Sequence, residues 1–277
     1  MRPTILAAAA ALWLAVPAVS QPRTAELARG AMQQMAANQG SANDYLLVLR
    51  YRDVRVPVYV YRHDGGWSSR TQPGTVWGDL LGTAVVWPAV MRAGEGAGEG
   101  AGALENAEYL GAETVDGRRA HVLGGSFATG ARLPDSMRVY LDAETRQLLR
   151  VVASGRSRQA GNALVGQGAG VWMSLDLADY TGTGGVVVPR RIRLRMRMEV
   201  AMDSLQREAV RRDVDRALTA LQSDPSPRAA EMRLMMDAFG RMLLGEEMDL
   251  PITVEEVRVD AGPPAWFDPA TMADPGP

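Results

Sequence analysis

The sequence predicts an α+β fold in which one antiparallel sheet carries helices gathered on one face. Several segments alternate apolar and polar residues, as strands with one buried face do. Asp116-Gly117 joins two such segments, and this dipeptide accepts the positive φ angles of a tight hairpin turn. Strands and helices do not alternate regularly along the chain, so parallel βαβ units are not expected.

The first residues have the organisation of a secretory signal peptide. Arg2 precedes an apolar run from Ile5 to Val19, and Ala18 and Ser20 are small enough for cleavage after Ser20. The run is shorter than the roughly 20 residues that span a bilayer, so a cleaved signal is favoured over a membrane anchor. We therefore expect a signal peptide over residues 1–20 and one mature domain over residues 21–277, which does not itself span a membrane.

The composition argues against several classes of function. The chain has no cysteine, which excludes disulfides, a thiol nucleophile and a lipid anchor on cysteine. Its net charge of −2 provides no general attraction to nucleic acid. Only His63 and His121 could supply imidazole chemistry, and neither stands in a metal-binding motif. We expect no enzyme activity, metal or cofactor; a hydrolase would require one histidine in a groove beside an acidic group.

The N-terminal half of the mature chain begins with a helix and continues as strands. Helical spacing of apolar residues predicts a helix over 24–38, which Gly40 ends. Residues 43–63 are rich in Val, Leu and Tyr and predict two strands, and residues 67–71 predict a third. Residues 75–91 are apolar on nearly all sides, and this pattern indicates a buried or lid-like helix.

The middle of the chain predicts a series of hairpins. The Asp116-Gly117 turn and the Asp142–Thr145 turn each join two strands within residues 109–152. Residues 171–180 alternate as a further strand. The segment VVVPRRIRLRMRMEV then continues the sheet with one apolar and one cationic face.

The cationic face of that strand has two interpretations. Its members are Arg191, Arg193, Arg195 and Arg197. Guanidinium groups bind phosphate or carboxylate groups of a ligand well. Alternatively, the arginines pair with acidic neighbours on a solvated strand face, for which the candidates are Asp176, Asp179, Glu255 and Glu256. The second interpretation is favoured because half-buried strands alternate in this way without a ligand.

Two helices and a final strand complete the chain. Asp203 and Gln206 predict a capping box, and Ser226 with Pro227 predicts the start of the second helix. The final strand is expected over residues 252–259. The second helix has a methionine-rich face that fits either an adaptable ligand-binding surface or ordinary core packing.

Four segments together resemble the periplasmic outer-membrane lipoprotein-sorting proteins, the LolA/LolB-like superfamily. They read VDGRRAHVL, MRVYLDAETRQLLRV, DYTGTGGVVVPRRIRL and ITVEEVRVDAGPPAWFDP. The resemblance implies a curved antiparallel sheet that forms a half-open barrel, with helices covering its concave face. It also implies a periplasmic location and no enzyme activity. Residues 203–245 look like a helical insertion relative to this family, and the absence of cysteine excludes an anchored receptor of the LolB type.

The function that the resemblance implies is a carrier for lipids or lipoproteins. Acyl chains, or a lipidated protein, would bind between sheet and helices, and an envelope membrane protein could be a further partner. The alternative is an envelope sensor or regulatory module of the RseB type, which binds protein segments. The apolar pattern selects these lining candidates: Leu47, Leu49, Val58, Val60, Trp77, Leu80, Leu81, Trp87, Met235, Met236 and Phe239.

Overall fold

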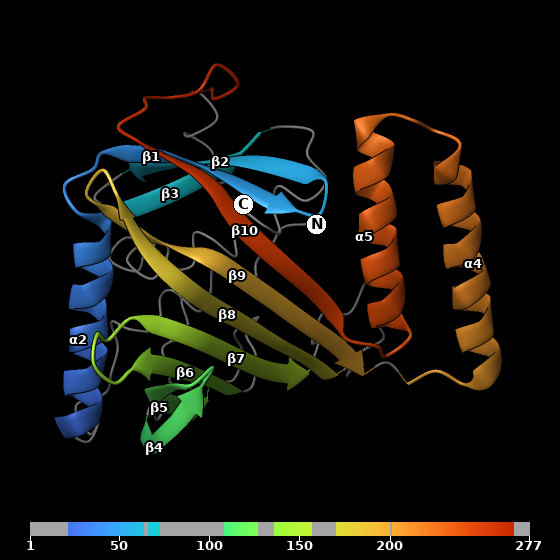
Figure 1. Ribbon diagram of the computed structural model, residues 1–277. Helices are drawn as coiled ribbons and strands as arrows, with labels where there is room; N and C mark the ends of the chain where they lie inside the picture. Colours follow the sequence, from blue (N-terminus) through green and yellow to red (C-terminus); the bar gives the residue numbers. More distant parts are fainter. Residues whose placement is uncertain are drawn as a thin grey trace.

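A ten-stranded antiparallel sheet forms the body of the structure (Figure 1). The computed structural model describes residues 22–63, 66–72, 108–126, 136–156, 170–199 and 201–268. The helix predicted over residues 75–91 lies outside these described residues.

The described elements confirm most of the predicted ranges. The helices are α2 (Pro22–Gln39), α4 (Ser204–Gln222) and α5 (Pro227–Leu243). The strands are β1 (Asp44–Tyr51), β2 (Val54–His63), β3 (Gly66–Thr71), β4 (Glu108–Val115), β5 (Arg118–Ser126), β6 (Ser136–Asp142), β7 (Leu148–Arg156), β8 (Gly170–Thr183), β9 (Val186–Glu199) and β10 (Met248–Val259).

The strand order is β3-β2-β1-β10-β9-β8-β7-β6-β5-β4. Neighbours are consecutive in the chain except at β1 and β10, where the first strand pairs with the last and Leu47 lies opposite Val257. The end strands, β3 and β4, are not paired with each other, so the described sheet is open.

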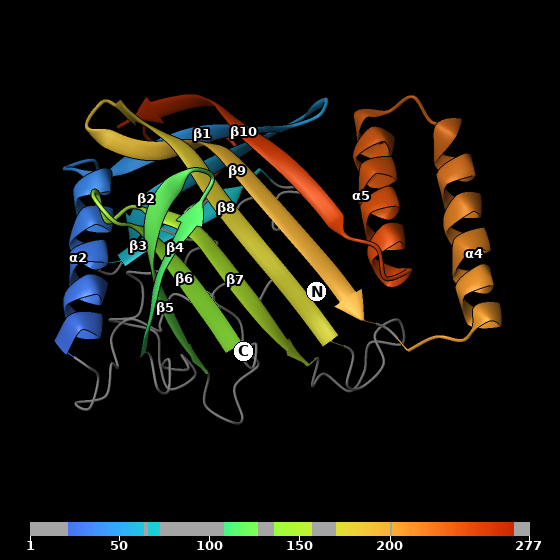
Figure 2. The same ribbon diagram turned by 60° about the horizontal axis from the view of Figure 1, so that its bottom comes forward.

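The sheet curves around α2. This helix contacts both β9 and β4, although β8, β7, β6 and β5 lie between those two strands in the sheet order. Figures 1 and 2 show α2 at one end of the strands, beside the β8–β9 and β6–β7 turns, so the sheet has to curve for one helix to reach both strands. Figure 2 shows the same curvature, which confirms the predicted curved, half-open arrangement.

Turn chemistry sets the registers of the predicted hairpins. Asp116 and Gly117 have φ angles of 49° and 80°, the positive values that a tight turn between β4 and β5 requires. In the β6–β7 turn, the Asp142 carboxylate accepts hydrogen bonds from the backbone N–H groups of Glu144 and Thr145 at 3.0 and 2.7 Å. The side chain therefore replaces backbone partners that the turn cannot supply.

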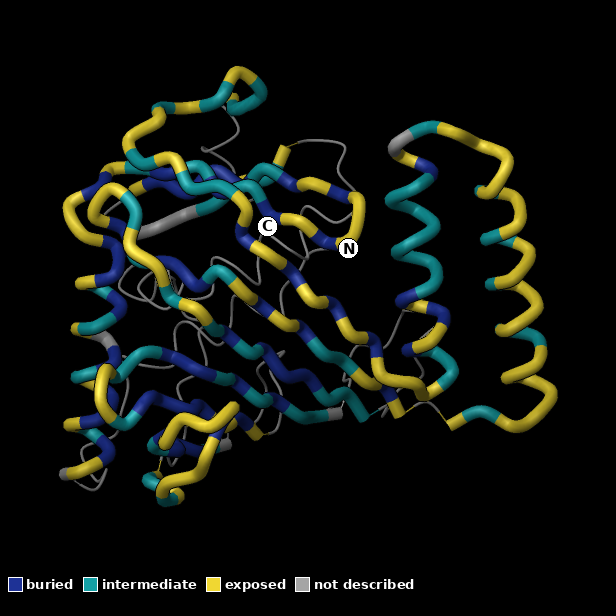
Figure 3. Tube along the Cα trace, viewed as in Figure 1, coloured by how far each residue is buried: buried dark blue, intermediate teal, exposed yellow. Residues whose placement is uncertain are grey.

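The apolar core lies on the concave face. On β1, buried Tyr45, Leu47 and Leu49 alternate with half-buried residues, as the pleat requires. Leu27 and Ala31 of α2 belong to the same buried cluster. The tube in Figure 3 shows this alternation along the strands.

The helices α4 and α5 form a hairpin beside the sheet. Both predicted caps are confirmed: Asp203 and Gln206 make a reciprocal capping box, and the Ser226 hydroxyl accepts from the Ala229 N–H. Ala238 and Met242 connect α5 to the core cluster, whereas α4 packs on α5 and has no buried residue. Helices α2 and α5 both reach the core, but from opposite ends of the sheet, and α4 forms an outer layer, so the helices are less closely gathered than expected.

Candidate ligand-binding site

Four of the predicted lining residues lie on the concave face. Leu47, Leu49, Val58 and Val60 are each at most 1% exposed, and they share one cluster with the buried residues of α2. The strand pattern thus selected side chains of a single face. That these four side chains contact a ligand stays a prediction.

Four other lining candidates, Trp77, Leu80, Leu81 and Trp87, lie outside the described residues. The remaining three are on α5, at the side of the sheet. Met235 packs against the core cluster, Met236 is half-buried, and Phe239 is 42% exposed. Phe239 is therefore not gathered with the strand residues in the core.

Helix α2 lies across one end of the curved sheet and packs on the core partly through small side chains. Ala28 and Ala31 are 5% and 1% exposed and lie between the larger Leu27 and Met35. Alanines let the helix axis approach the sheet closely but contribute little apolar area. The middle of α2 can therefore separate from the sheet at a lower cost than a helix anchored by leucines.

The C-terminal end of α2 rests directly on the β8–β9 turn. Gly40 has a φ of +54°, and a Cβ added there would lie 2.3 Å from the carbonyl oxygen of Gly185. The sequence predicted Gly40 only as a helix end. The contact with Gly185 was not predictable because it joins segments far apart in the chain.

An apolar crevice beside this end of α2 contains an unpaired polar atom. Its lining includes Met35, Gln39, Tyr45, Tyr180 and Val188. Gln39 is 5% exposed, and its Oε1 has no hydrogen-bond partner. Burial raises the pKa of both tyrosines, so their hydroxyls stay neutral at physiological pH. The crevice can accept a small hydrogen-bond donor such as water beside the apolar face.

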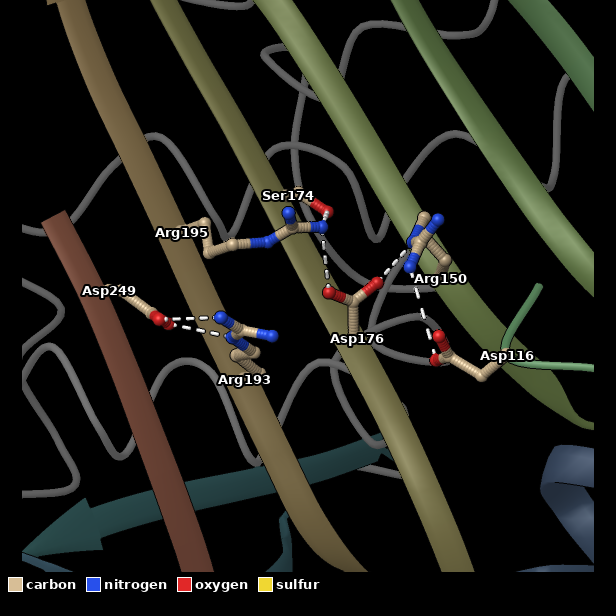
Figure 4. A network of polar contacts seen from close by, with 7 residues as sticks. All are labelled: Asp116, Arg150, Ser174, Asp176, Arg193, Arg195 and Asp249. Carbon is tan, nitrogen blue, oxygen red and sulfur yellow. Dashed lines mark hydrogen bonds and ion pairs between the residues drawn. The ribbon is translucent and has the colours of Figure 1, made fainter. Parts of the chain in front are cut away.

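The arginines of β9 pair with carboxylates on the convex face, as the favoured interpretation predicted (Figure 4). Arg193 holds Asp249 through two hydrogen bonds of 2.8 and 2.6 Å. Asp176 lies between Arg195, at 3.0 Å, and Arg150 of β7. These guanidinium groups are paired with carboxylates of the sheet and are not free for a phosphate, although the buried Nε of Arg195 has no hydrogen-bond partner among the described residues.

Two of the four acidic partners predicted for the arginines of β9 are confirmed. Asp176 and Asp179 do pair with β9, and the hydrogen bond from Arg191 lowers the pKa of Asp179. Glu255 instead pairs with arginines at the β1–β2 turn, and Glu256 pairs with Arg258. Both glutamates lie on the half of β10 beyond its pairing with β9, which the sequence pattern did not reveal.

The two histidines lie in opposite halves of the strand order. His63 is on β2 and His121 is on β5. The polar contact of His121 is Tyr109, and the charged groups that act on it are arginines. Within the described residues, no group of three or more His, Asp or Glu side chains could hold a metal ion.

The comparisons with known proteins concern the fold. The structure is similar to an outer membrane lipoprotein-sorting protein domain from Vibrio parahaemolyticus, with a TM-score of 0.40, 10% identity, and 87% of this chain and 93% of that chain covered. The structure is also similar to a DUF1329 family protein from Desulfovibrio piger, with a TM-score of 0.43, 10% identity, and 91% of this chain and 99% of that chain covered. A LolA superfamily protein from Nitrosomonas europaea is similar with a TM-score of 0.35 and 9% identity, and 85% of this chain and 94% of that chain are covered.

No family model matches the sequence, and no curated protein matches it. Two of these solved structures are named as a lipoprotein-sorting protein domain and a LolA superfamily protein. No helix in the described part of the chain is long and apolar enough to cross a membrane.

Proposed function

We propose that the protein is exported to the periplasm, where it holds acyl chains of a lipid or a lipidated protein between the curved sheet and its covering helices. The observation that carries the proposal is the continuous apolar concave face under α2. Leu49, Val58 and Leu194 on this face are each 0% exposed, and they come from three strands. The signal-like N-terminus and the sequence resemblance to lipoprotein-sorting proteins support the compartment and the class of ligand.

Physical chemistry explains why such a face suits acyl chains. Each CH₂ group moved from water into an apolar site contributes ~0.8 kcal/mol, so a long chain binds strongly without specific polar contacts. Protein interiors are closely packed, so an acyl chain has to displace side chains or a covering helix on entry. Helix α2, with alanines at its contact, is the described element best suited to move.

The proposal is tested with mature protein, residues 21–277, by two measurements. Organic extraction of protein purified from the cell envelope is expected to release lipid. Native mass spectrometry of delipidated protein is expected to show uptake of palmitate and of a diacylated lipopeptide. Butyrate has the same carboxylate with a short chain and serves as the control; it should not bind.

The absence of both extracted lipid and acyl uptake would contradict the proposal. Equal binding of butyrate and palmitate would contradict the role of the apolar face, because the shared carboxylate would then explain the binding. Recovery of a tightly bound protein segment with no lipid would indicate the sensor function instead.

A further inference from the structure

Arg23, Tyr109 and His121 connect the N-terminal end of α2 to the β4–β5 hairpin. The Arg23 Nη2 lies 3.3 Å from the Tyr109 hydroxyl, and that hydroxyl lies 3.1 Å from Nδ1 of His121. The guanidinium also stacks over the Tyr109 ring, 4.3 Å from its centroid. The chain of contacts therefore joins three elements: α2, β4 and β5.

The direction of the hydrogen bond between Tyr109 and His121 depends on where the imidazole carries its proton. A guanidinium has only donors, so Arg23 donates to the Tyr109 oxygen. The single hydroxyl hydrogen of Tyr109 is then available for Nδ1 of His121. That nitrogen accepts only when the imidazole is neutral and carries its proton on Nε2. When Nδ1 carries a proton, it donates to the Tyr109 oxygen instead, and that oxygen then accepts from two cations, Arg23 and the imidazolium.

Among the described residues, the charged groups that act on His121 are all cationic. Burial lowers its pKa below the ordinary 6.5, and Arg146, Arg23 and Arg119 lower it further. Arg23 comes from α2, Arg119 from the same strand, and Arg146 follows the β6–β7 turn. Its other strand neighbours, Ala112 on β4 and Leu141 on β6, carry no charge. An imidazolium here would be a fourth positive charge among three arginines.

Apart from the apolar packing of Leu27 and Ala28 in the core, helix α2 has few described contacts that hold its N-terminal end. Its first turn contains no acidic residue, and Arg23 places a positive charge where the helix dipole favours a negative one. The opposite end is held by the close contact of Gly40 with Gly185. The two ends are therefore secured differently, and only the N-terminal end depends on a titratable group.

We propose that protonation of His121 releases the N-terminal end of α2 from the hairpin while the C-terminal end stays on the β8–β9 turn. Protonation reverses the hydrogen bond, so that Nδ1 and Arg23 both donate to the Tyr109 oxygen, and the added charge on the imidazole repels the guanidinium of Arg23. This inference rests on the proposed function for its biological meaning, because the released helix would expose the apolar concave face to a ligand.

The absence of cysteine allows a direct test with paired spin labels. Glu26→Cys on α2 and Arg138→Cys on β6 are both exposed positions. Electron–electron distance measurements on mature protein without ligand are expected to give one population at pH 7.5. At pH 5.0 a second, longer population should appear, with half-conversion below pH 6.5, the ordinary value for histidine.

Three variants in the labelled background identify the responsible group. His121→Gln should keep the short distance at both pH values, because an amide stays uncharged. His63→Gln, which changes the only other histidine, should leave the pH response intact. Tyr109→Phe removes the central hydroxyl and should produce the longer population already at pH 7.5.

An unchanged distance distribution in the parent protein at pH 5.0 would overturn the inference. A pH response that persists in His121→Gln would overturn it as well, and circular dichroism establishes that each variant is folded. Because no ligand is present, the outcome is independent of the acyl-binding assay. Acyl uptake without helix movement would contradict only the proposed role of His121. Helix movement without acyl uptake would contradict only the proposed carrier function.

Discussion

On β9, adjacent side chains face opposite surfaces with opposite requirements. Ile192 and Leu194 point to the concave face and are 2% and 0% exposed. Arg193 and Arg195, which alternate with them along the strand, point to the convex face. The convex arginines find carboxylate partners on neighbouring strands. The concave residues have no such partners within the sheet and need a cover of helices or ligand. A binding function is therefore best sought on the concave side.

The largest expected difference between the faces is in packing. Leu49→Ala on the concave side of β1 should lower the free energy of unfolding by about 2–5 kcal/mol, because the side chain is 0% exposed. Leu46→Ala, on the same strand and the opposite face, should cost about 1 kcal/mol or less. Urea unfolding measures both, and equal losses would mean that the convex face is as tightly packed as the concave one.

On the convex face, burial should decide the cost of losing a carboxylate. The Asp176 side chain is 12% exposed and pairs with two arginines, so Asp176→Asn should cost about 2 kcal/mol. Asp249 is 38% exposed and pairs with one, so Asp249→Asn should cost less than about 1 kcal/mol. Urea unfolding at low and at high salt measures the free energy of unfolding of both variants. A greater loss in the Asp249 variant would refute this ranking.

Acid should act through the convex face as well. Burial raises the pKa of Asp142, but hydrogen bonds from Thr145 and Glu144 and the charge of Arg118 outweigh it, so the pKa is lowered from 3.8. A carboxyl with a depressed folded-state pKa stabilises the fold above its unfolded value and loses this contribution as the pH falls through the folded value. The free energy of unfolding should therefore decrease below pH 3.8, and Asp142→Asn should make that decrease smaller in urea titrations. The same decrease in the variant and the parent protein would argue against this role of Asp142.

The smallest effect is expected at an exposed pair. Arg197 lies 3.3 Å from Glu199, and both side chains are more than half exposed. Arg197→Gln should change the free energy of unfolding by no more than about 0.5 kcal/mol. A loss above 1 kcal/mol in urea unfolding would show that the ion pairs of this face contribute more than their exposure suggests.

Local patterns predicted the elements of this fold well. Alternation located the strands, Asp116-Gly117 located a hairpin, and the caps at Asp203 and Ser226 located both late helices. These signals act over a few residues, so they are readable in one sequence. The same period-2 pattern placed Leu47 and Val58 on one face.

Long-range relations were not predictable in this way. Nothing local indicates that β1 pairs with β10, that α2 reaches both β9 and β4, or that Arg150 shares Asp176 with Arg195. The contacts of His121 were also missed, because Arg23 lies almost a hundred residues away in the chain. Such contacts depend on the strand order and curvature of the whole sheet.

The most direct test of the account locks α2 onto the sheet. A Cβ on Gly30 would lie 3.6 Å from Cγ of Arg146, so Gly30→Cys with Arg146→Cys can form a disulfide in a chain without other cysteines. Palmitate binding is then measured in the oxidised and reduced forms of this one variant. If acyl chains enter beneath α2, oxidation should weaken binding at least about tenfold, or about 1.4 kcal/mol, and reduction should restore it. Equal binding in the two forms would contradict the claim that α2 covers the binding face.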